Sequence, residues 1–253
     1  DDGGVSGSSD ERYVVCMKWG TKYGAEYVDR LYGMVRRHLR GDFRFVCLTD
    51  RSQGIRAEVS CLPIPPLDLP AGIPERGWNK LTTFSAELHE RHGLRGTALF
   101  LDLDVVIVDD ITPFFELPGE FLIIHDWKRP WRITGNSSVY RWRLGAHVDL
   151  FQYFREHVEQ VRASVRHEQA YLSDYLHKQG KLAYWPKPWC ASWKYHCIPR
   201  FPGNYWREPF IPAGARILIF HGVMNPPDAL AGHSQGNWRH ARPAPWIAEH
   251  WRE

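Results

Sequence analysis

The chain has 253 residues, of which 43% are hydrophobic and 24% are charged, the composition of a globular protein with one large domain or two small ones. Its formal net charge of +3 gives no reason to expect nucleic acid as a partner. No apolar run approaches the roughly 20 residues that span a bilayer, and no signal peptide is visible, so we expect a cytoplasmic protein. The five cysteines include no C-x-x-C pair, which argues against a zinc site.

Strand and helix patterns alternate over the first hundred residues. The predicted elements are, in chain order, a strand over 13–17, a helix over 25–39, strands over 43–48 and 58–64, a Pro- and Gly-rich loop to about residue 77, a helix over 78–92 and a strand over 98–101. This alternation is typical of a parallel α/β sheet.

The pattern becomes less regular in the rest of the chain. There we predict strands over 121–125 and 137–142, helices over 149–161 and 168–179, and strands over 181–185 and 216–220. The expected fold class is therefore α/β, with a mixed, mostly parallel sheet flanked by helices. We expect a single domain over 13–253 behind a disordered Gly- and Ser-rich lead over 1–12.

The run 99–108 is the most informative feature, because a buried-strand pattern leads into Asp102 and Asp104, which are separated by one residue. Successive side chains of a strand point to opposite faces, so both carboxylates can reach one point if the strand ends there. Two carboxylates at one point repel each other unless a positive charge lies between them. Mg²⁺ or Mn²⁺ is the simplest candidate, and a strand followed by an acidic turn is the alternative.

Two other segments are expected beside this motif, because ligands of open α/β sheets lie beyond the carboxyl ends of the strands. The loop after the first strand offers Lys18, Trp19 and Tyr23, which suit a base, a ribose or a phosphate, although a solvated loop would look the same. The late apolar strand ends in His221, whose imidazole would complete a ligand set for Mn²⁺ with the two carboxylates.

The pattern resembles glycosyltransferases of the GT-A fold, most closely the family-8-type, glycogenin-like and galactosyltransferase-like group. Besides the D-x-D motif and the late strand that ends in His-Gly, the resemblance depends on the segments Asn79-Lys80-Leu81, Gly135-Asn136-Ser137-Ser138-Val139-Tyr140 and Glu168-Gln169-Ala170-Tyr171-Leu172. It covers most of the chain from residue 13 to about residue 226, in scattered pieces.

The resemblance implies transfer of a sugar from a nucleotide sugar, most simply a UDP-sugar, to an acceptor hydroxyl with the help of Mn²⁺ or Mg²⁺. Asp102 would contact the ribose and the metal, and Asp104 and His221 would contact the metal. Tyr23 would stack on the base, while Lys80 and Asn136 would border the donor. A nucleotide-binding half over 13–110 and an acceptor-facing half over 111–253 are expected.

The sequence departs from the family pattern after the late histidine. The family-8 motif at this point includes Lys-Pro-Trp, whose lysine binds the diphosphate, whereas this chain continues with Val223-Met224-Asn225. Another cation must therefore replace that lysine, and Lys80, Lys187 and Lys194 are the candidates. Ser138 and Glu168 also differ from the commonest text, which indicates a divergent member of the fold.

The stereochemistry of the transfer stays open. In an inverting enzyme a carboxylate such as Glu168 or Asp174 would be the general base. In a retaining enzyme, as family-8 relatives are, no strong base is needed, and Gln169 would lie beneath the sugar ring. Asp126 is a further catalytic candidate, or else an aspartate of a turn.

Two other interpretations remain. The chain could be a phosphatase of the haloacid dehalogenase type, with Asp102 as nucleophile and Asp104 as acid/base, but that family needs a later strand that ends in a second acidic pair. It could also be a non-catalytic nucleotide- or glycan-binding relative. The acceptor, whether glycan, lipid-linked or protein, is not predicted. The basic, aromatic segments 127–132 and 238–251 would meet a glycan, an anionic lipid surface in peripheral membrane contact, or solvent.

Overall fold

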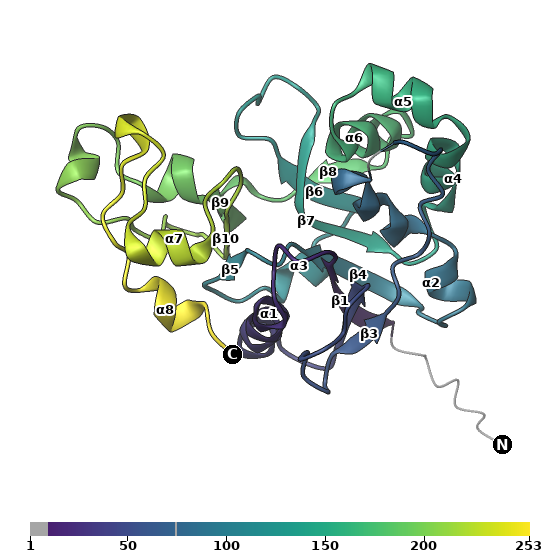
Figure 1. The fold of residues 1–253 in the computed structure, drawn as a ribbon, viewed down its shortest axis with the longest axis horizontal. Coiled ribbons are helices and arrows are strands. Elements are labelled where there is room, and N and C mark those ends of the chain that lie inside the picture. The colour runs from purple at the N-terminus through teal and green to yellow at the C-terminus, as the bar shows by residue number, and fades with distance from the viewer. Residues whose placement is uncertain (1–9, 74) are drawn as a thin grey trace.

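The computed structural model describes residues 10–73 and 75–253, which form a seven-stranded sheet and a smaller three-stranded sheet (Figure 1). The large sheet has the order β3-β2-β1-β4-β7-β6-β8. Its strands are β1 (Glu11–Lys18), β2 (Arg44–Thr49), β3 (Ser60–Leu62), β4 (Gly96–Leu101), β6 (Phe121–His125), β7 (Gly135–Arg143) and β8 (Leu182–Tyr184). Only β7 runs antiparallel to its neighbours. The predicted mixed, mostly parallel α/β sheet is confirmed.

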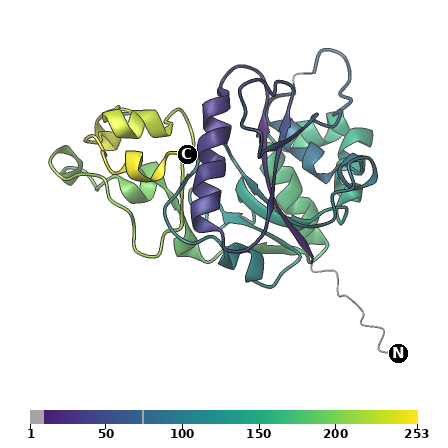
Figure 2. The same ribbon diagram turned by 90° about the horizontal axis from the view of Figure 1, so that it is seen from below.

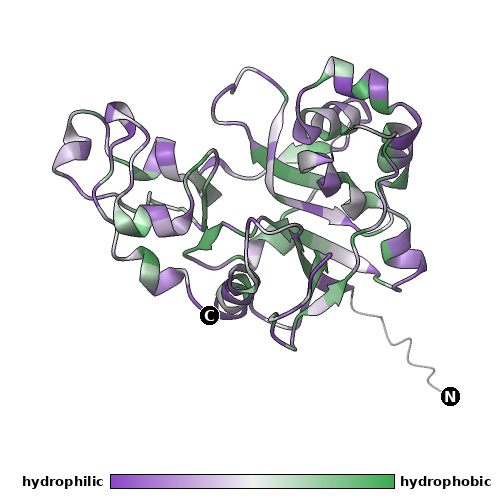
Figure 3. Cartoon of the chain, viewed as in Figure 1, coloured by the Kyte–Doolittle hydropathy of each residue, from purple (hydrophilic) through white to green (hydrophobic). Residues whose placement is uncertain are grey.

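The central strands are apolar on both faces, because helices cover the sheet from both sides. In β1, Val14 and Cys16 belong to the core beneath helix α1 (Ala25–His38), whereas Tyr13 and Val15 belong to the core on the opposite face. This is the two-residue periodicity of an extended strand. Figure 2 shows α1 packed along one side of the sheet, and Figure 3 shows that several strands of the sheet, β6 and β8 among them, are strongly hydrophobic.

The opposite face is covered by α4 (Val148–Glu156), α5 (Val158–Ser164) and α6 (Glu168–Lys178). The prediction of one helix over 149–161 was wrong, because His157 leaves the helical conformation at φ −130° and ψ 34° and separates α4 from α5. Helix α6 has nearly its predicted bounds. It has 11 residues and a face of buried side chains, so its helical period is visible in the sequence.

The predicted helix over 78–92 also differs from the structure. A 3₁₀ helix over Arg76–Phe84 is followed by the short α2 (Glu87–Glu90), and Ser85 between them is extended. The hydroxyls of Thr82 and Thr83 donate to the carbonyls three residues earlier, which fits the tighter 3₁₀ turn. This segment carries Lys80 to the edge of the sheet.

The smaller sheet consists of β5 (Val106–Ile107), β10 (Ile217–Ile219) and β9 (Cys190–Ser192). Because β10 runs antiparallel to β5, which follows the D-x-D motif directly, the end of β10 points back toward that motif. The short helices α3 (Pro113–Glu116), α7 (Pro226–Ala231) and α8 (Ile247–His250) were not predicted, since four to six residues are too few to show a helical period.

The N-terminal boundary lies earlier than the sequence indicated. Strand β1 begins at Glu11, so the end of the predicted lead over 1–12 belongs to the sheet, while residues 1–9 lie outside the described residues. Within the described part of the chain, no helix combines the length and apolarity needed to cross a bilayer.

Candidate active site

Asp102 and Asp104 lie in the turn that follows β4. The Asp102 N–H donates to the carbonyl of Ser138 at 3.0 Å, which continues the pairing of β4 with β7 one step beyond the strand. Leu103 points into the core and is 4% exposed, whereas both aspartates are partly exposed. β4 ends before the motif, but both aspartates line one cavity, so the carboxylates lie on the same side as the strand pattern predicted.

Two cavities meet at Asp102 and Lys80. One has a volume of about 550 Å³ and is lined only by residues between 17 and 104, including Trp19, Tyr23 and Asp104; we call it the N-terminal cavity. The other has a volume of about 660 Å³ and is lined mainly by the loop 126–134 and by later segments; we call it the loop cavity. Asp102 and Lys80 are thus the residues through which groups in the two cavities can interact.

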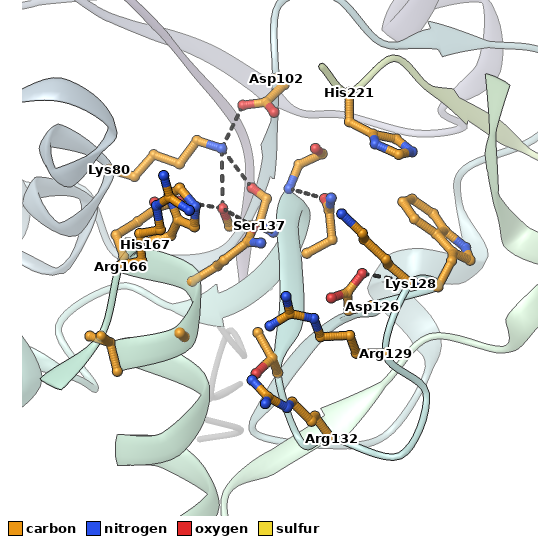
Figure 4. A pocket seen from close by; sticks show the side chains of 18 of the residues that line it. Lys80, Asp102, Asp126, Lys128, Arg129, Arg132, Ser137, Arg166, His167 and His221 are labelled. Carbon is orange, nitrogen blue, oxygen red and sulfur yellow. Dashed lines mark hydrogen bonds and ion pairs between the residues drawn. The ribbon is translucent and has the colours of Figure 1, made fainter. Parts of the chain in front are cut away.

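Ser137 holds the segments of the site together. Its Oγ donates to Glu168 Oε1 at 2.6 Å, and its N–H donates to Gln169 Oε1 at 3.1 Å. Its carbonyl accepts from Lys80 Nζ at 3.0 Å, and the same Nζ lies 2.8 Å from Asp102 Oδ1 (Figure 4). Apart from the late His-Gly strand, the separate sequence segments that resemble the glycosyltransferase pattern are therefore joined by direct polar contacts.

The charge of Lys80 is well compensated. Burial alone would lower the pKa of Lys80, but the carboxylates of Asp102 and Glu168 outweigh it and raise this pKa. Its ammonium also lies 5.2 Å from the centre of the Phe100 ring. Lys80 is thus a fixed positive charge between the two cavities.

Asp104 is in the opposite situation. Burial, and next to it the charge of Asp102, raise the pKa of Asp104, against a smaller lowering by the Tyr23 hydroxyl. That hydroxyl lies 3.2 Å from Asp104 Oδ2 and 3.3 Å from Asn225 Oδ1. The nearby positive charge does not fully neutralise the two carboxylates of Asp102 and Asp104. A divalent cation that prefers oxygen ligands would neutralise the rest.

His221 lies at the loop cavity and not beside Asp104. Its Nε2 is 2.6 Å from Ser192 Oγ, and its ring stacks on Trp127 at 5.4 Å between ring centres. Among the residues that the structure describes, no three His, Cys, Asp or Glu side chains are grouped closely enough to hold a metal ion. The ligand set predicted from the sequence is not assembled in this structure, so a metal role for His221 stays a prediction.

The structure brings most of the predicted site residues together. Those that line the N-terminal cavity are Trp19, Tyr23, Lys80, Asp102 and Asp104, and those that line the loop cavity are Lys80, Asp102, Asp126, Asn136, Glu168, Gln169 and His221. Lys18 lines neither of them and is only 6% exposed. Asp174 is exposed and pairs with Lys178 on α6, away from both cavities.

Sequence reasoning missed several residues of the site. Ser137 was part of a matching segment, but nothing in the sequence indicated that it would bond to two other segments, through Lys80 and through Glu168 and Gln169. Within the loop 126–134, the sequence analysis noted Asp126 as a catalytic candidate and the segment 127–132 as basic and aromatic, and the structure places this loop at the wall of the loop cavity, between α6 and the smaller sheet (Figure 1). Its composition was a signal for binding, but its location depends on the tertiary fold.

Lys194 is the one candidate replacement for the missing lysine that lies beside the late histidine. A Cβ on Gly222 would lie 3.4 Å from Lys194 Nζ, so the ammonium is next to the residue that follows His221. Burial, Arg239 and Lys128 all lower the pKa of Lys194, which shows that its neighbours are cations. Lys187, by contrast, does not line either cavity of the site.

Comparison with known proteins adds information through structure alone. No family model matches the sequence, and no curated protein matches it. A crystal structure of the galactosyltransferase LgtC in complex with donor and acceptor sugar analogues superposes with a TM-score of 0.57, covers 94% of this chain and 99% of LgtC, and is 15% identical. The chain has the GT-A fold.

A second structure supports this assignment. An active-site mutant of LgtC superposes with a TM-score of 0.55 at 16% identity and covers 85% of this chain and 89% of LgtC. At this level of identity the likeness establishes the fold. The GT-A architecture expected from the D-x-D strand and the late His-Gly strand is confirmed.

Proposed function

We propose that this protein is a metal-dependent glycosyltransferase that moves a sugar from a UDP-sugar to an acceptor hydroxyl. The observation that supports this most directly is the position of Asp102, which lies after a central strand of a GT-A sheet where two cavities meet. One cavity then receives the nucleotide, and the other receives the sugar and the acceptor. LgtC, which shares the fold, was crystallised with analogues of both substrates.

The N-terminal cavity is assigned to the nucleotide. Trp19 is 46% exposed and offers an aromatic face to the base. Tyr23 is less available for stacking, because its ring packs 4.6 Å from that of Tyr27 and its hydroxyl lies beside Asp104. We therefore assign the base to Trp19, and we assign to Tyr23 the positioning of Asp104.

Asp102 and Asp104 fit a divalent cation, because their combined charge is only partly compensated by Lys80. Mn²⁺ or Mg²⁺ bound there would neutralise the charge that grows on the leaving diphosphate. Lys194, beside Gly222, is assigned as the cation that replaces the missing family lysine on the diphosphate. Electrostatic stabilisation of the leaving group is then the main contribution of the site to catalysis.

The loop cavity is assigned to the sugar and the acceptor. Gln169 is held by Ser137 and lines this cavity, so its amide can lie against the sugar ring. Glu168 is 8% exposed and accepts from Ser137 Oγ, which suits it to holding Ser137 and Lys80 in position. Asp126 also lines the cavity, and its Oδ1 accepts a hydrogen bond from the backbone N–H of Lys128.

Calorimetric titration with UDP tests this proposal, in the presence of Mn²⁺ and, separately, in excess chelator. We expect UDP to bind and to raise the unfolding midpoint only when the metal is present, since a ligand that binds the native state alone stabilises it. Asp104→Asn removes one oxygen ligand and is expected to weaken metal-dependent UDP binding by about 10–100-fold. Equal UDP affinity in chelator, or an unaffected Asp104→Asn protein, would contradict the metal site.

A further inference from the structure

The loop cavity has an excess of positive charge. Six Lys or Arg side chains line it against three Asp or Glu side chains, an excess as large as the net charge of the entire chain. In the N-terminal cavity the two lysines Lys22 and Lys80 are balanced by Asp102 and Asp104. Cationic residues are thus concentrated in the cavity that we assign to the sugar and the acceptor.

The acidic residues of the loop cavity are already engaged. Asp102 pairs with Lys80, Glu168 accepts from Ser137 Oγ, and Asp126 accepts from a backbone N–H. Within residues 10–73 and 75–253, no ion pair and no side-chain hydrogen bond is formed by the remaining cations of the cavity, which are Lys128, Arg129, Arg132, Arg166 and Lys194. These side chains therefore line the cavity without an ion-pair partner in the protein, and the ammonium of Lys194 lies 5.3 Å from the centre of the Tyr195 ring.

The donor accounts for only part of this charge. Lys194 lies beside Gly222 and is assigned to the diphosphate, and Lys128 lies near it. In the view of Figure 4, Arg129 and Arg132 lie at the end of the cavity away from Asp102 and His221. Arginine is the residue suited to binding a planar carboxylate or a phosphate through two parallel hydrogen bonds.

A third arginine lies at the start of α6. Arg166 precedes the N-cap residue His167, which offers no side-chain hydrogen bond to the helix. The first residues of this 11-residue helix, Glu168 to Ala170, line the same cavity as Arg166, and helix N-termini favour anions. Two separate elements, the loop 126–134 and the start of α6, therefore present positive charge to one space.

We infer that the acceptor carries an anionic group, a carboxylate or a phosphate, which Arg129, Arg132 and Arg166 bind in the loop cavity. This inference rests on the proposed glycosyltransferase function, and it adds the chemical class of the acceptor. The anionic group holds the acceptor so that its hydroxyl faces the donor sugar near Gln169. An acidic sugar and a phosphorylated sugar share this chemistry.

The test uses protein saturated with UDP and Mn²⁺, so that the diphosphate subsite is already filled. Calorimetry then compares methyl glucuronide with methyl glucoside, and glucose 6-phosphate with glucose. We expect the charged member of at least one pair to bind about 10-fold more tightly, the effect of one charge-assisted bidentate contact. The first pair reports a carboxylate acceptor, and the second reports a phosphorylated one.

Variants connect the preference to the cavity. The double substitution Arg129→Gln and Arg132→Gln is expected to remove the preference while UDP affinity stays within about twofold of the wild type. Arg91→Gln, which changes an exposed arginine outside both cavities, is the matched control and should keep the preference. Circular dichroism verifies that the double variant is folded.

Several results would overturn the inference. These are equal affinity within both pairs, no measurable binding of either charged sugar, or a preference that survives in the folded double variant. Inorganic phosphate that binds as tightly as glucose 6-phosphate would indicate an anion site without a sugar subsite, and it would also overturn the assignment. If UDP itself does not bind, the proposed function fails; if UDP binds and no preference appears, only the inference fails.

Discussion

The N-terminal cavity and the loop cavity are built in different ways. The first is formed by residues 17–104, from the ends of β1 and β4 and the 3₁₀ helix beside them. Besides the shared Lys80 and Asp102, the second combines four segments that are far apart in the chain, in the ranges 126–138, 164–170, 194–195 and 220–221. The comparison shows that strand ends of the large sheet form the cavity assigned to the nucleotide. Loops and helix N-termini from the second half of the chain form most of the cavity assigned to the sugar and the acceptor.

The two cavities also differ in charge. Lysines and aspartates balance in the N-terminal cavity, while cations exceed acids twofold in the loop cavity. If the assignments are right, substitutions in the first should change UDP binding, and substitutions in the second should change acceptor binding, except at Lys194, which is assigned to the diphosphate of UDP. Residues shared by both should change both.

The largest effect is expected for Asp102→Asn, because Asp102 belongs to both cavities and pairs with Lys80. The variant should lose sugar transfer by about 10³-fold, since a group that stabilises the leaving diphosphate is removed together with the partner of a buried cation. Rates of UDP release and of product formation measure this loss. Asp109→Asn, an exposed aspartate beyond the motif that lines neither cavity, is the control, and a comparable loss there would contradict the assignment.

A smaller effect is expected for Lys194→Gln. Its ammonium lies beside Gly222, so its removal should weaken UDP binding about 10-fold, the usual value of one charge-assisted hydrogen bond. Lys187→Gln should leave UDP binding unchanged, because Lys187 lines neither cavity. Calorimetric titration with UDP and Mn²⁺ separates the two variants. If Lys187→Gln weakened UDP binding and Lys194→Gln did not, the assignment of the diphosphate to the region beside His221 would be wrong.

The smallest effect is expected for Trp19→Ala, which removes the exposed aromatic face of the N-terminal cavity. Stacking on a base contributes about 1–3 kcal/mol, and at the low end of this range, which we expect for a ring as exposed as that of Trp19, UDP affinity falls by about 5-fold. Binding of an acceptor sugar to the UDP-saturated protein should stay the same. Trp238→Ala, which changes a tryptophan that is 70% exposed and lines neither cavity, should have no effect on either measurement. If Trp19→Ala changes only acceptor binding, the two assignments must be exchanged.

Local patterns allowed much of the sheet to be predicted. The strands over 13–17, 98–101 and 121–125 lie within the observed β1, β4 and β6, because a strand buried on both faces has a continuous apolar run. The errors occur where local geometry overrides that pattern. The extended Ser85 and the non-helical His157 each interrupt a helix that the spacing of apolar residues predicted.

The candidate site shows the same division. The D-x-D motif and the segments around Lys80, Ser137 and Gln169 could be recognised from the sequence, because each is a short run with a fixed composition. Their mutual contacts could not, since the hydrogen bonds of Ser137 join residues that are 31 to 57 positions apart. The segment 127–132 was noted from the sequence for its basic and aromatic residues, but only the pairing of β6 with β7 places the loop that contains it at the cavity.

The sequence by itself determined the alternating elements, the end of β4 at the two aspartates and the GT-A resemblance, since all three depend on neighbours in the chain. The tertiary structure decided that Asp102 joins two cavities, that Lys194 lies beside Gly222, and that His221 contacts Ser192. It also gathered unpaired arginines into one of these cavities. Such relations depend on strand order, register and loop paths, which are fixed by packing over the entire molecule.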